Sequence, residues 1–295
     1  MADAAFFLPA ARPAARTLRA LLREPRVVIA GGFLLVLVIL ALFAPQIAPK
    51  DPLEQDLMLA TMPPMTSPDA APGCFLGTDD LGRDVLSRVI FGTRIALTVA
   101  FTAAGLSAVI GTLLGLAAGW YGGWTDRLVS RLVDIWMAFP PVLLSVLLVA
   151  VLGPGLHSVI AAIVIIDWTR FCRVVRAETL TQAKLDYVTA AQALGFSRLQ
   201  ILFKEILPNV APVLLALVSL EMGIAVIVEA ILSFVGLSLS SDTPTWGGMI
   251  AAGREIVHQA WWVLVFPLLA LFATVLAFNQ LGNGLRNALD PVMRR

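Results

Sequence analysis

The feature that most constrains this chain is a series of apolar runs, each close to 20 residues long and nearly free of charge. A helix needs roughly 20 apolar residues to cross a hydrocarbon core about 30 Å thick. The chain is 59% hydrophobic and 14% charged, so the sequence predicts an all-α integral membrane protein with six transmembrane helices. The six runs are residues 27–44, 95–120, 135–152, 158–176, 212–235 and 261–281.

The distribution of basic residues predicts the orientation of these spans. Lys and Arg favour cytoplasmic segments. If the N-terminal end is inside, the cytoplasmic side holds 16 of the 21 Lys and Arg residues, counting those at the inner ends of the spans. We therefore expect both termini in the cytoplasm. Five arginines precede the first span: Arg12, Arg16, Arg19, Arg23 and Arg26.

The N-terminal region has two interpretations. A basic segment before an apolar run is typical of a cleaved signal peptide. Here the run is too long and no A-x-A site follows, so residues 1–26 are expected as a basic cytoplasmic segment and residues 27–47 as an uncleaved helical anchor. The net charge of +1 gives no indication of nucleic-acid binding.

Residues 48–93 form a long outer segment that begins rich in Pro and Asp. Its last part, "TDDLGRDVLSRVIFGTR", offers Asp79 or Asp80 as a helix N-cap, followed by apolar residues at helical spacing. This pattern predicts an amphipathic helix at the membrane interface or, as an open alternative, the first turns of the second span. A second outer segment carries Trp246, Trp261 and Trp262, which are expected in the aromatic belt.

The largest inner loop contains the polar stretch "YVTAAQALGFSRLQILFKEILPN", residues 187–209. Asp186 is expected to cap a first helix that Gly195 ends in the left-handed conformation. Ser197 and Gln200 form a capping-box pattern that starts a second helix. Pro208 is expected to stop that second helix.

The apolar faces of these two helices leave two readings open. Either the faces pack on the protein's own helix ends, or they dock another protein, because small residues such as Ala190 and Ala191 permit close approach.

Catalytic motifs are lacking. A phosphate-binding P-loop ends in Gly-Lys-Ser/Thr, yet none of the three lysines, Lys50, Lys184 and Lys204, follows a glycine. His157 and His258 are far apart in sequence and have no accompanying cysteine cluster, which argues against a zinc site. We expect no enzyme activity and no cofactor on this chain.

Three acids lie inside predicted spans, where a charge is costly and is usually paired or functional: Asp167, Glu221 and Glu229. Asp167 is three residues before Arg170, a spacing that predicts an ion pair. Glu229 is expected either to hydrogen-bond another helix or to line a substrate path, and both readings stay open for Glu221. A secondary transporter that uses these acids as a proton relay is the alternative function.

Residues 189–208 resemble the EAA loop of ABC importer permeases. Ala190, Ala191, Gly195, Leu207 and Pro208 match its pattern, whereas Thr189 replaces the usual glutamate and Glu205 the usual isoleucine. Three further blocks resemble the C-type subunit of the dipeptide, oligopeptide and nickel permeases: "LGTDDLGRDVLSRVIFGTRIAL", "YGGWTDRLVSRLVDIWMAFP" and "EAILSFVGLSLSSDTPTWGGMI". The closing "LGNGLRNALDP" is also similar.

This resemblance implies a type I permease domain at residues 94–291, with five helices and a coupling loop at residues 177–209. It implies that Ala190, Ala191, Gly195, Leu199, Ile206, Leu207 and Pro208 contact an ATPase. It also implies a homologous B-type permease partner, two cytoplasmic ATPase subunits that bind ATP and Mg, an extracytoplasmic binding protein, and a place in the bacterial inner membrane. Peptides are the expected cargo, with nickel chelates or other small solutes as the alternative.

Overall fold

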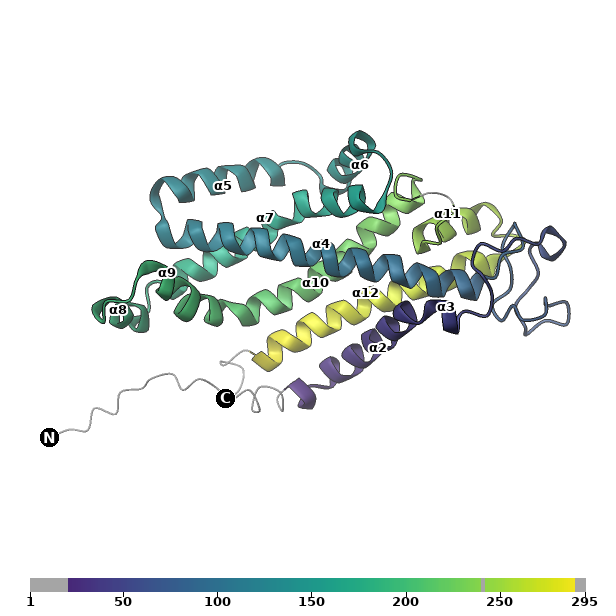
Figure 1. Cartoon of the computed structure of the whole chain (residues 1–295), viewed down its shortest axis with the longest axis horizontal. Helices are drawn as coiled ribbons and strands as arrows, with labels where there is room; N and C mark the ends of the chain where they lie inside the picture. The colour runs from purple at the N-terminus through teal and green to yellow at the C-terminus, as the bar shows by residue number, and fades with distance from the viewer. Residues whose placement is uncertain (1–20, 240–241, 290–295) are drawn as a thin grey trace.

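The computed structural model describes residues 21–239 and 242–289, which form an elongated bundle of helices (Figure 1). The first five helical elements are α2 (Pro25–Leu42), α3 (Ala44–Ile47), the 3-10 turn η1 (Leu57–Leu59), α4 (Val85–Tyr121) and α5 (Gly123–Met137). The next five are α6 (Pro141–Leu152), α7 (Leu156–Gln182), α8 (Asp186–Ala193), α9 (Arg198–Ile201) and the π-helical turn η2 (Leu202–Ile206). The last three are α10 (Leu207–Phe234), α11 (Trp246–Glu255) and α12 (Trp261–Leu289).

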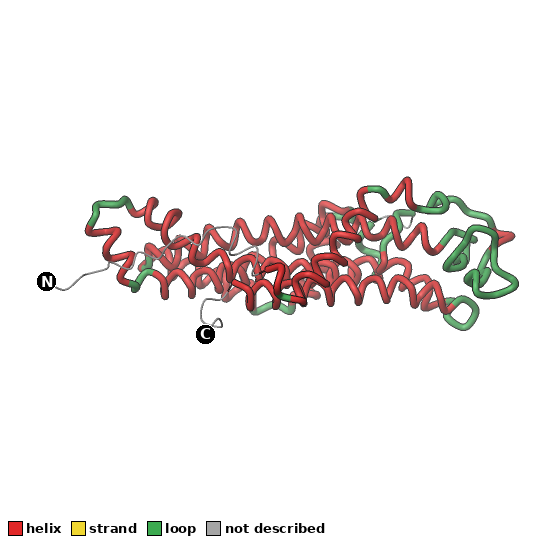
Figure 2. Tube along the Cα trace, turned by 90° about the horizontal axis from the view of Figure 1, so that it is seen from below, coloured by secondary structure: helices red, strands yellow, loops and turns green. Residues whose placement is uncertain are grey.

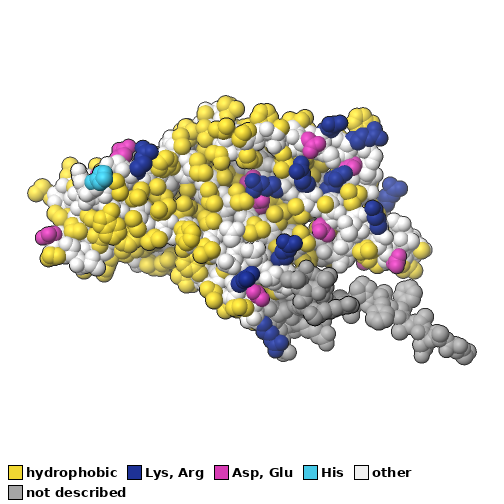
Figure 3. Space-filling view, turned by 180° about the vertical axis from the view of Figure 1, so that it is seen from behind, with side chains coloured by type: hydrophobic (Ala, Val, Ile, Leu, Met, Phe, Trp, Pro, Cys, Tyr) yellow, Lys and Arg dark blue, Asp and Glu magenta, His cyan; other side chains and the backbone are white. Residues whose placement is uncertain are grey.

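The bundle has two different ends. One, the loop-rich end, is formed by the segments around α3 and α11, and the other, the basic end, carries α8, α9, the start of α2 and the end of α12 (Figures 1 and 2). Hydrophobic side chains cover a broad middle belt, while Lys and Arg gather toward the basic end (Figure 3). Arg12, Arg16 and Arg19 lie outside the described residues. An apolar belt of this kind fits a protein embedded in a bilayer.

Four helical stretches of the described chain are long and apolar enough to cross a membrane, or five if a bent pair counts as one span. The four are Pro25–Leu42, Val85–Tyr121, Arg198–Phe234 and Trp261–Leu289. The bent pair is α5 and α6, which meet at 88°.

The predicted third span at 135–152 is therefore wrong as one helix. Pro140 and Pro141 interrupt it, because a residue before proline avoids the helical conformation. The 12 residues of α6 alone extend only about 18 Å.

The predicted fourth span corresponds to α7, which has 27 residues but carries several charges. Because of these charges, α7 is not among the helices that are apolar enough to cross a membrane by composition alone. Most of its long interface is with α4, which it accompanies through the bundle (Figure 1).

Glycines make that interface possible. A Cβ atom at Gly115 of α4 would lie 2.7 Å from the carbonyl oxygen of Cys172 on α7, and Gly111 and Gly119 approach α7 equally closely. Small residues repeated every four positions let two backbones pack in contact.

The predicted amphipathic helix in the outer segment is also not separate. Asp84, and not Asp79 or Asp80, is the N-cap of α4, and its Oδ2 accepts a hydrogen bond from the Ser87 amide at 2.8 Å. The apolar residues that follow are the first turns of the 37-residue α4. Asp79 instead stabilises the preceding turn, where it binds the Arg83 guanidinium at 2.7 Å.

Two of the three predicted belt tryptophans are buried at the loop-rich end. The indole of Trp246 donates to the Val89 carbonyl at 3.0 Å, and that of Trp262 donates to the Thr78 carbonyl at 2.9 Å. Only Trp261 is exposed. The two buried indoles therefore tie α11 to the first turns of α4 and α12 to the loop that precedes α4.

Candidate functional site

The segment from α8 to α9 has the local structure that its sequence predicts. Gly195 has a φ of +83°. The Phe196 amide donates to the Ala191 carbonyl at 3.1 Å and the Gly195 amide to the Gln192 carbonyl at 3.0 Å, which is the Schellman pattern of a helix C-terminus. Both hydrogen bonds of the capping box between Ser197 and Gln200 are formed. One detail differs: Leu185 is the N-cap of α8, and Asp186 is its first residue.

The prediction that Pro208 ends the second helix is wrong. Arg198–Phe234 forms one continuous stretch through α9, η2 and α10. Proline in a helix lacks an amide donor and clashes with the carbonyl four residues earlier. The wider π-turn at Leu202–Ile206 directly precedes Pro208, and such turns accommodate an interruption of the helical pattern. The Asn209 side chain also donates to the Glu205 carbonyl at 2.7 Å.

One face of the α8–α9 segment packs on the protein itself. Val188, Ile201 and Ile206 are at most 1% exposed, and they contact Leu116 of α4 and Val175 of α7. The Tyr187 hydroxyl donates to Gln182 at 2.8 Å, and burial raises the pKa of Tyr187, so the hydroxyl stays protonated at neutral pH. The segment is thus fixed to the ends of α4 and α7.

The opposite face is exposed and apolar. We call Leu194, Phe196, Leu199 and Phe203 the exposed loop surface; their exposed fractions are 76%, 44%, 56% and 46%. An exposed apolar cluster outside the membrane belt is a candidate interaction site. Leu194 and Phe203 belong to the apolar helix faces that the sequence predicts, but neither they nor Phe196 were among the predicted ATPase contacts.

The predicted contact residues divide between the two faces. Gly195, Leu199 and Pro208 are exposed, Ala190 and Leu207 are half-buried, and Ala191 and Ile206 are in the core. The buried face therefore packs on the protein's own helix ends, while docking of another protein on the exposed face stays a prediction.

The acids of the predicted spans also have definite partners. Nη1 of Arg170 on α7 lies 3.2 Å from both carboxylate oxygens of Glu221 on α10. The predicted pair of Asp167 with Arg170 is wrong: no ion pair within 4 Å joins them, because the guanidinium turns to the neighbouring helix. Because Glu221 is buried, replacing Arg170 by an uncharged residue would leave a buried carboxylate without its cation, which is costly in folding free energy.

Glu229 makes local contacts. Its Oε1 accepts hydrogen bonds from Ser233 at 2.6 Å and Ser238 at 3.4 Å, both within or just after its own helix. At 1% exposure, Glu229 is held at the loop-rich end of α10. It links α10 to the following turn, and Ser238 in turn accepts the Gly155 amide at 2.6 Å before α7.

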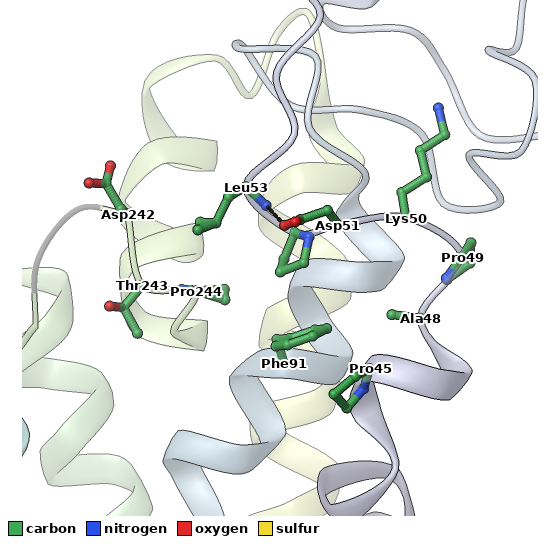
Figure 4. Close-up of a pocket in the computed structure, with 11 residues that line it drawn as sticks. Pro45, Ala48, Pro49, Lys50, Asp51, Leu53, Phe91, Asp242, Thr243 and Pro244 are labelled. Atoms are coloured by element: carbon green, nitrogen blue, oxygen red, sulfur yellow. Dashed lines mark hydrogen bonds between the residues drawn. The ribbon is translucent and has the colours of Figure 1, made fainter.

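A third region is an open cavity of about 720 Å³ at the loop-rich end (Figure 4). Its walls come from the loop after α3, Phe91 of α4 and the segment before α11. Lys50, Asp51, Asp242 and Thr243 line the cavity together with apolar, proline-rich residues, and the Asp51 carboxylate accepts a hydrogen bond from the Leu53 amide at 2.9 Å. The cavity offers charges of both signs.

Comparison with known families gives two matches. Residues 111–295 match the family described as "Binding-protein-dependent transport system inner membrane component". Residues 12–64 match the "N-terminal TM domain of oligopeptide transport permease C".

Curated relatives extend over nearly the whole chain. The chain is 41% identical over 266 residues to the Di/tripeptide transport system permease protein DppC of Pseudomonas aeruginosa, covering 90% of this chain and 88% of the relative. It is 42% identical over 275 residues to the Dipeptide transport system permease protein DppC of Escherichia coli K12, covering 92% and 91%. It is 39% identical over 279 residues to the Glutathione transport system permease protein GsiD of Pectobacterium atrosepticum, covering 94% and 90%.

A solved structure shares the fold. A chain of the MetNI methionine ABC transporter in an inward-facing conformation superposes with a TM-score of 0.57 at 22% identity, covering 69% of this chain and 97% of that chain.

Proposed function

Because the chain belongs to the family of binding-protein-dependent transport system inner membrane components, we propose that it is the C-type membrane subunit of an ABC importer for di- and oligopeptides. The curated relatives that cover most of the chain carry peptide or glutathione transport in their names. Nickel chelates or other small solutes are the alternative cargo within the same family.

The observation that carries this proposal is the exposed loop surface at the basic end. Its four large apolar side chains are 44% to 76% exposed, while the opposite face of the same segment is buried. A short amphipathic helix of this form suits a groove in a soluble protein. We assign its partner as one of two cytoplasmic ATPase subunits, which would bind ATP and Mg.

In this proposal the basic end faces the cytoplasm and both termini lie there. The loop-rich end then faces outside, where its cavity would meet an extracytoplasmic binding protein that delivers the peptide. A homologous B-type permease subunit completes the pathway within the lipid bilayer, and we place Asp167, Glu221 and Glu229 along this chain's part of it.

The coupling mechanism follows from continuity of the helix. Closure of the ATPases would displace the exposed loop surface, and the uninterrupted stretch Arg198–Phe234 would carry the displacement to Glu221 and Glu229. The chain itself needs no catalytic group in this mechanism, since the free energy comes from nucleotide on the partners.

The test is uptake by the assembled importer in proteoliposomes. We expect uptake of a labelled dipeptide to require ATP on the ATPase side and the binding protein on the other, and to persist when a protonophore collapses the pH gradient. Uptake that needs no ATP and follows an imposed pH gradient would instead support a secondary transporter that uses the three acids as a proton relay.

A further inference from the structure

A cavity of about 210 Å³ lies between α6, α7 and α10. Its polar lining consists of Ser145, Asp167 and Arg170, and the remaining wall is Ile, Val and Pro. Asp167 is about 17 Å along the helix axis from the start of α7 and about 23 Å from its end. Asp167 therefore lies near the middle of α7.

Asp167 is the unusual group in this cavity. Asp167 is only 5% exposed. Within residues 21–239 and 242–289, the Asp167 carboxylate makes no hydrogen bond and no ion pair. A buried carboxylate without a partner is strongly unfavourable, so a proton or a cationic group must balance it.

The neighbouring charges supply that balance only in part. Arg170 lies 3.2 Å from both oxygens of Glu221, so one cation and one anion are already matched. Asp167 interacts electrostatically with both of them at longer range. When both acids are ionised, the three side chains together carry one excess negative charge beside the cavity.

We infer that this cavity binds the terminal ammonium group of the transported peptide, with Asp167 as its counter-ion. This inference rests on the proposed function. An ammonium group has three donors, which the Asp167 carboxylate and the oxygen of Ser145 can accept. The volume equals that of about seven water molecules, enough for one end of a peptide. Every unmodified peptide has this group, so one site serves side chains of many kinds.

Residues at the rim of the cavity are exposed, so a cysteine placed there can report the charge of Asp167 through its reaction with charged reagents. Val142 and Ile227 line it and are 39% and 38% exposed. In an importer whose native Cys74 and Cys172 are replaced by alanine, a Val142→Cys variant is labelled with a cationic and an anionic methanethiosulfonate reagent. The ratio of cationic to anionic labelling rates should fall by about tenfold or more when Asp167→Asn is added. Asp134→Asn is the matched control, because Asp134 is exposed on α5 and pairs with Arg173.

Protection then identifies the ligand. Ala-Ala should slow labelling of Val142→Cys, N-acetyl-Ala-Ala should not, and Asp167→Asn should abolish the difference. An unchanged rate ratio in Asp167→Asn would mean that the carboxyl carries a proton, and equal effects of the two peptides would mean that no ammonium is recognised. Either result overturns the inference.

Uptake is measured with the same preparations. If the unmodified importer shows no ATP-dependent uptake, the proposed function is refuted. Normal uptake by the unmodified importer together with either negative labelling result would refute only the ammonium site.

Discussion

At the scale of single residues, Gly195 decides how the exposed loop surface is presented. Its φ of +83° lies in the left-handed region, and a Cβ atom there would meet no other atom within 4 Å. The requirement for glycine is therefore one of backbone conformation and not of space. Leu194 and Phe196 stand on either side of this corner, so their directions depend on it.

We expect Gly195→Val to cost about 1 to 3 kcal/mol of local strain, because a β-branched residue strongly disfavours this conformation. Substrate-stimulated ATP hydrolysis and uptake by the importer should fall by more than half, while the amount of protein in the membrane stays near normal.

Gly195→Asn is the control, since asparagine tolerates the left-handed region better than other residues with a side chain. It should retain more uptake than the valine variant. Equal activity of valine and glycine at this position would show that the corner does not set the coupling.

Residue-level prediction succeeded where the chemistry is local and failed where it is distant. The capping box and the glycine corner depend on neighbours within six positions, which a sequence displays directly. The partner of Arg170 is Glu221, 51 residues away, and it was assigned to Asp167 because spacing along one helix cannot reveal the neighbouring helix.

At the scale of elements, the pairing of α4 with α7 depends on the glycines Gly111, Gly115 and Gly119. Their four-residue spacing was visible in the sequence, and it indicates a face for close helix packing. The break between α5 and α6 was visible as Pro140–Pro141, but the high hydropathy on both sides masked it. The length of α4 was harder to foresee, since the sequence offers three aspartates as caps.

We expect Gly115→Leu to destabilise the protein strongly, because a Cβ atom would lie 2.7 Å from the Cys172 carbonyl oxygen and 2.9 Å from Cβ of Val175. Such overpacking costs about 1 to 3 kcal/mol or more. Thermal unfolding of the purified importer, followed by intrinsic fluorescence, should show a clear decrease in midpoint.

Gly105→Leu is the control on the same helix, since a Cβ atom there has no neighbour within 4 Å. Its unfolding midpoint should be unchanged or slightly higher, because leucine is the better helix former. A similar decrease for both variants would mean that the α4–α7 contact is not the cause.

At the scale of the whole molecule, the orientation in the membrane is the prediction that depends most on charge. The belt in Figure 3 separates the basic end from the loop-rich end. Both native cysteines are free and buried. Replacing them by alanine therefore breaks no disulfide and removes the chain's own thiols from a labelling experiment.

In a variant with alanine at Cys74 and Cys172, cysteines at Met58 and His258 should react with an impermeant thiol reagent in right-side-out vesicles. A cysteine at Gln200 should react only after the vesicles are opened. All three positions are exposed in the structure, so burial does not confuse the result. Labelling of position 200 in sealed vesicles would reverse the orientation.

The unbroken stretch Arg198–Phe234 has a consequence for the size of motions. Its 37 residues span about 54 Å, and Ile206 and Val210 in its first turns are held in the core. A rod held near one end acts as a lever. A tilt of about 10° at that fulcrum would swing its far end by roughly 7 Å over the ~40 Å that follow. A shift of about 2 Å at Leu199, which is roughly 10 to 16 Å from the fulcrum, would then be amplified about threefold at the far end of the helix.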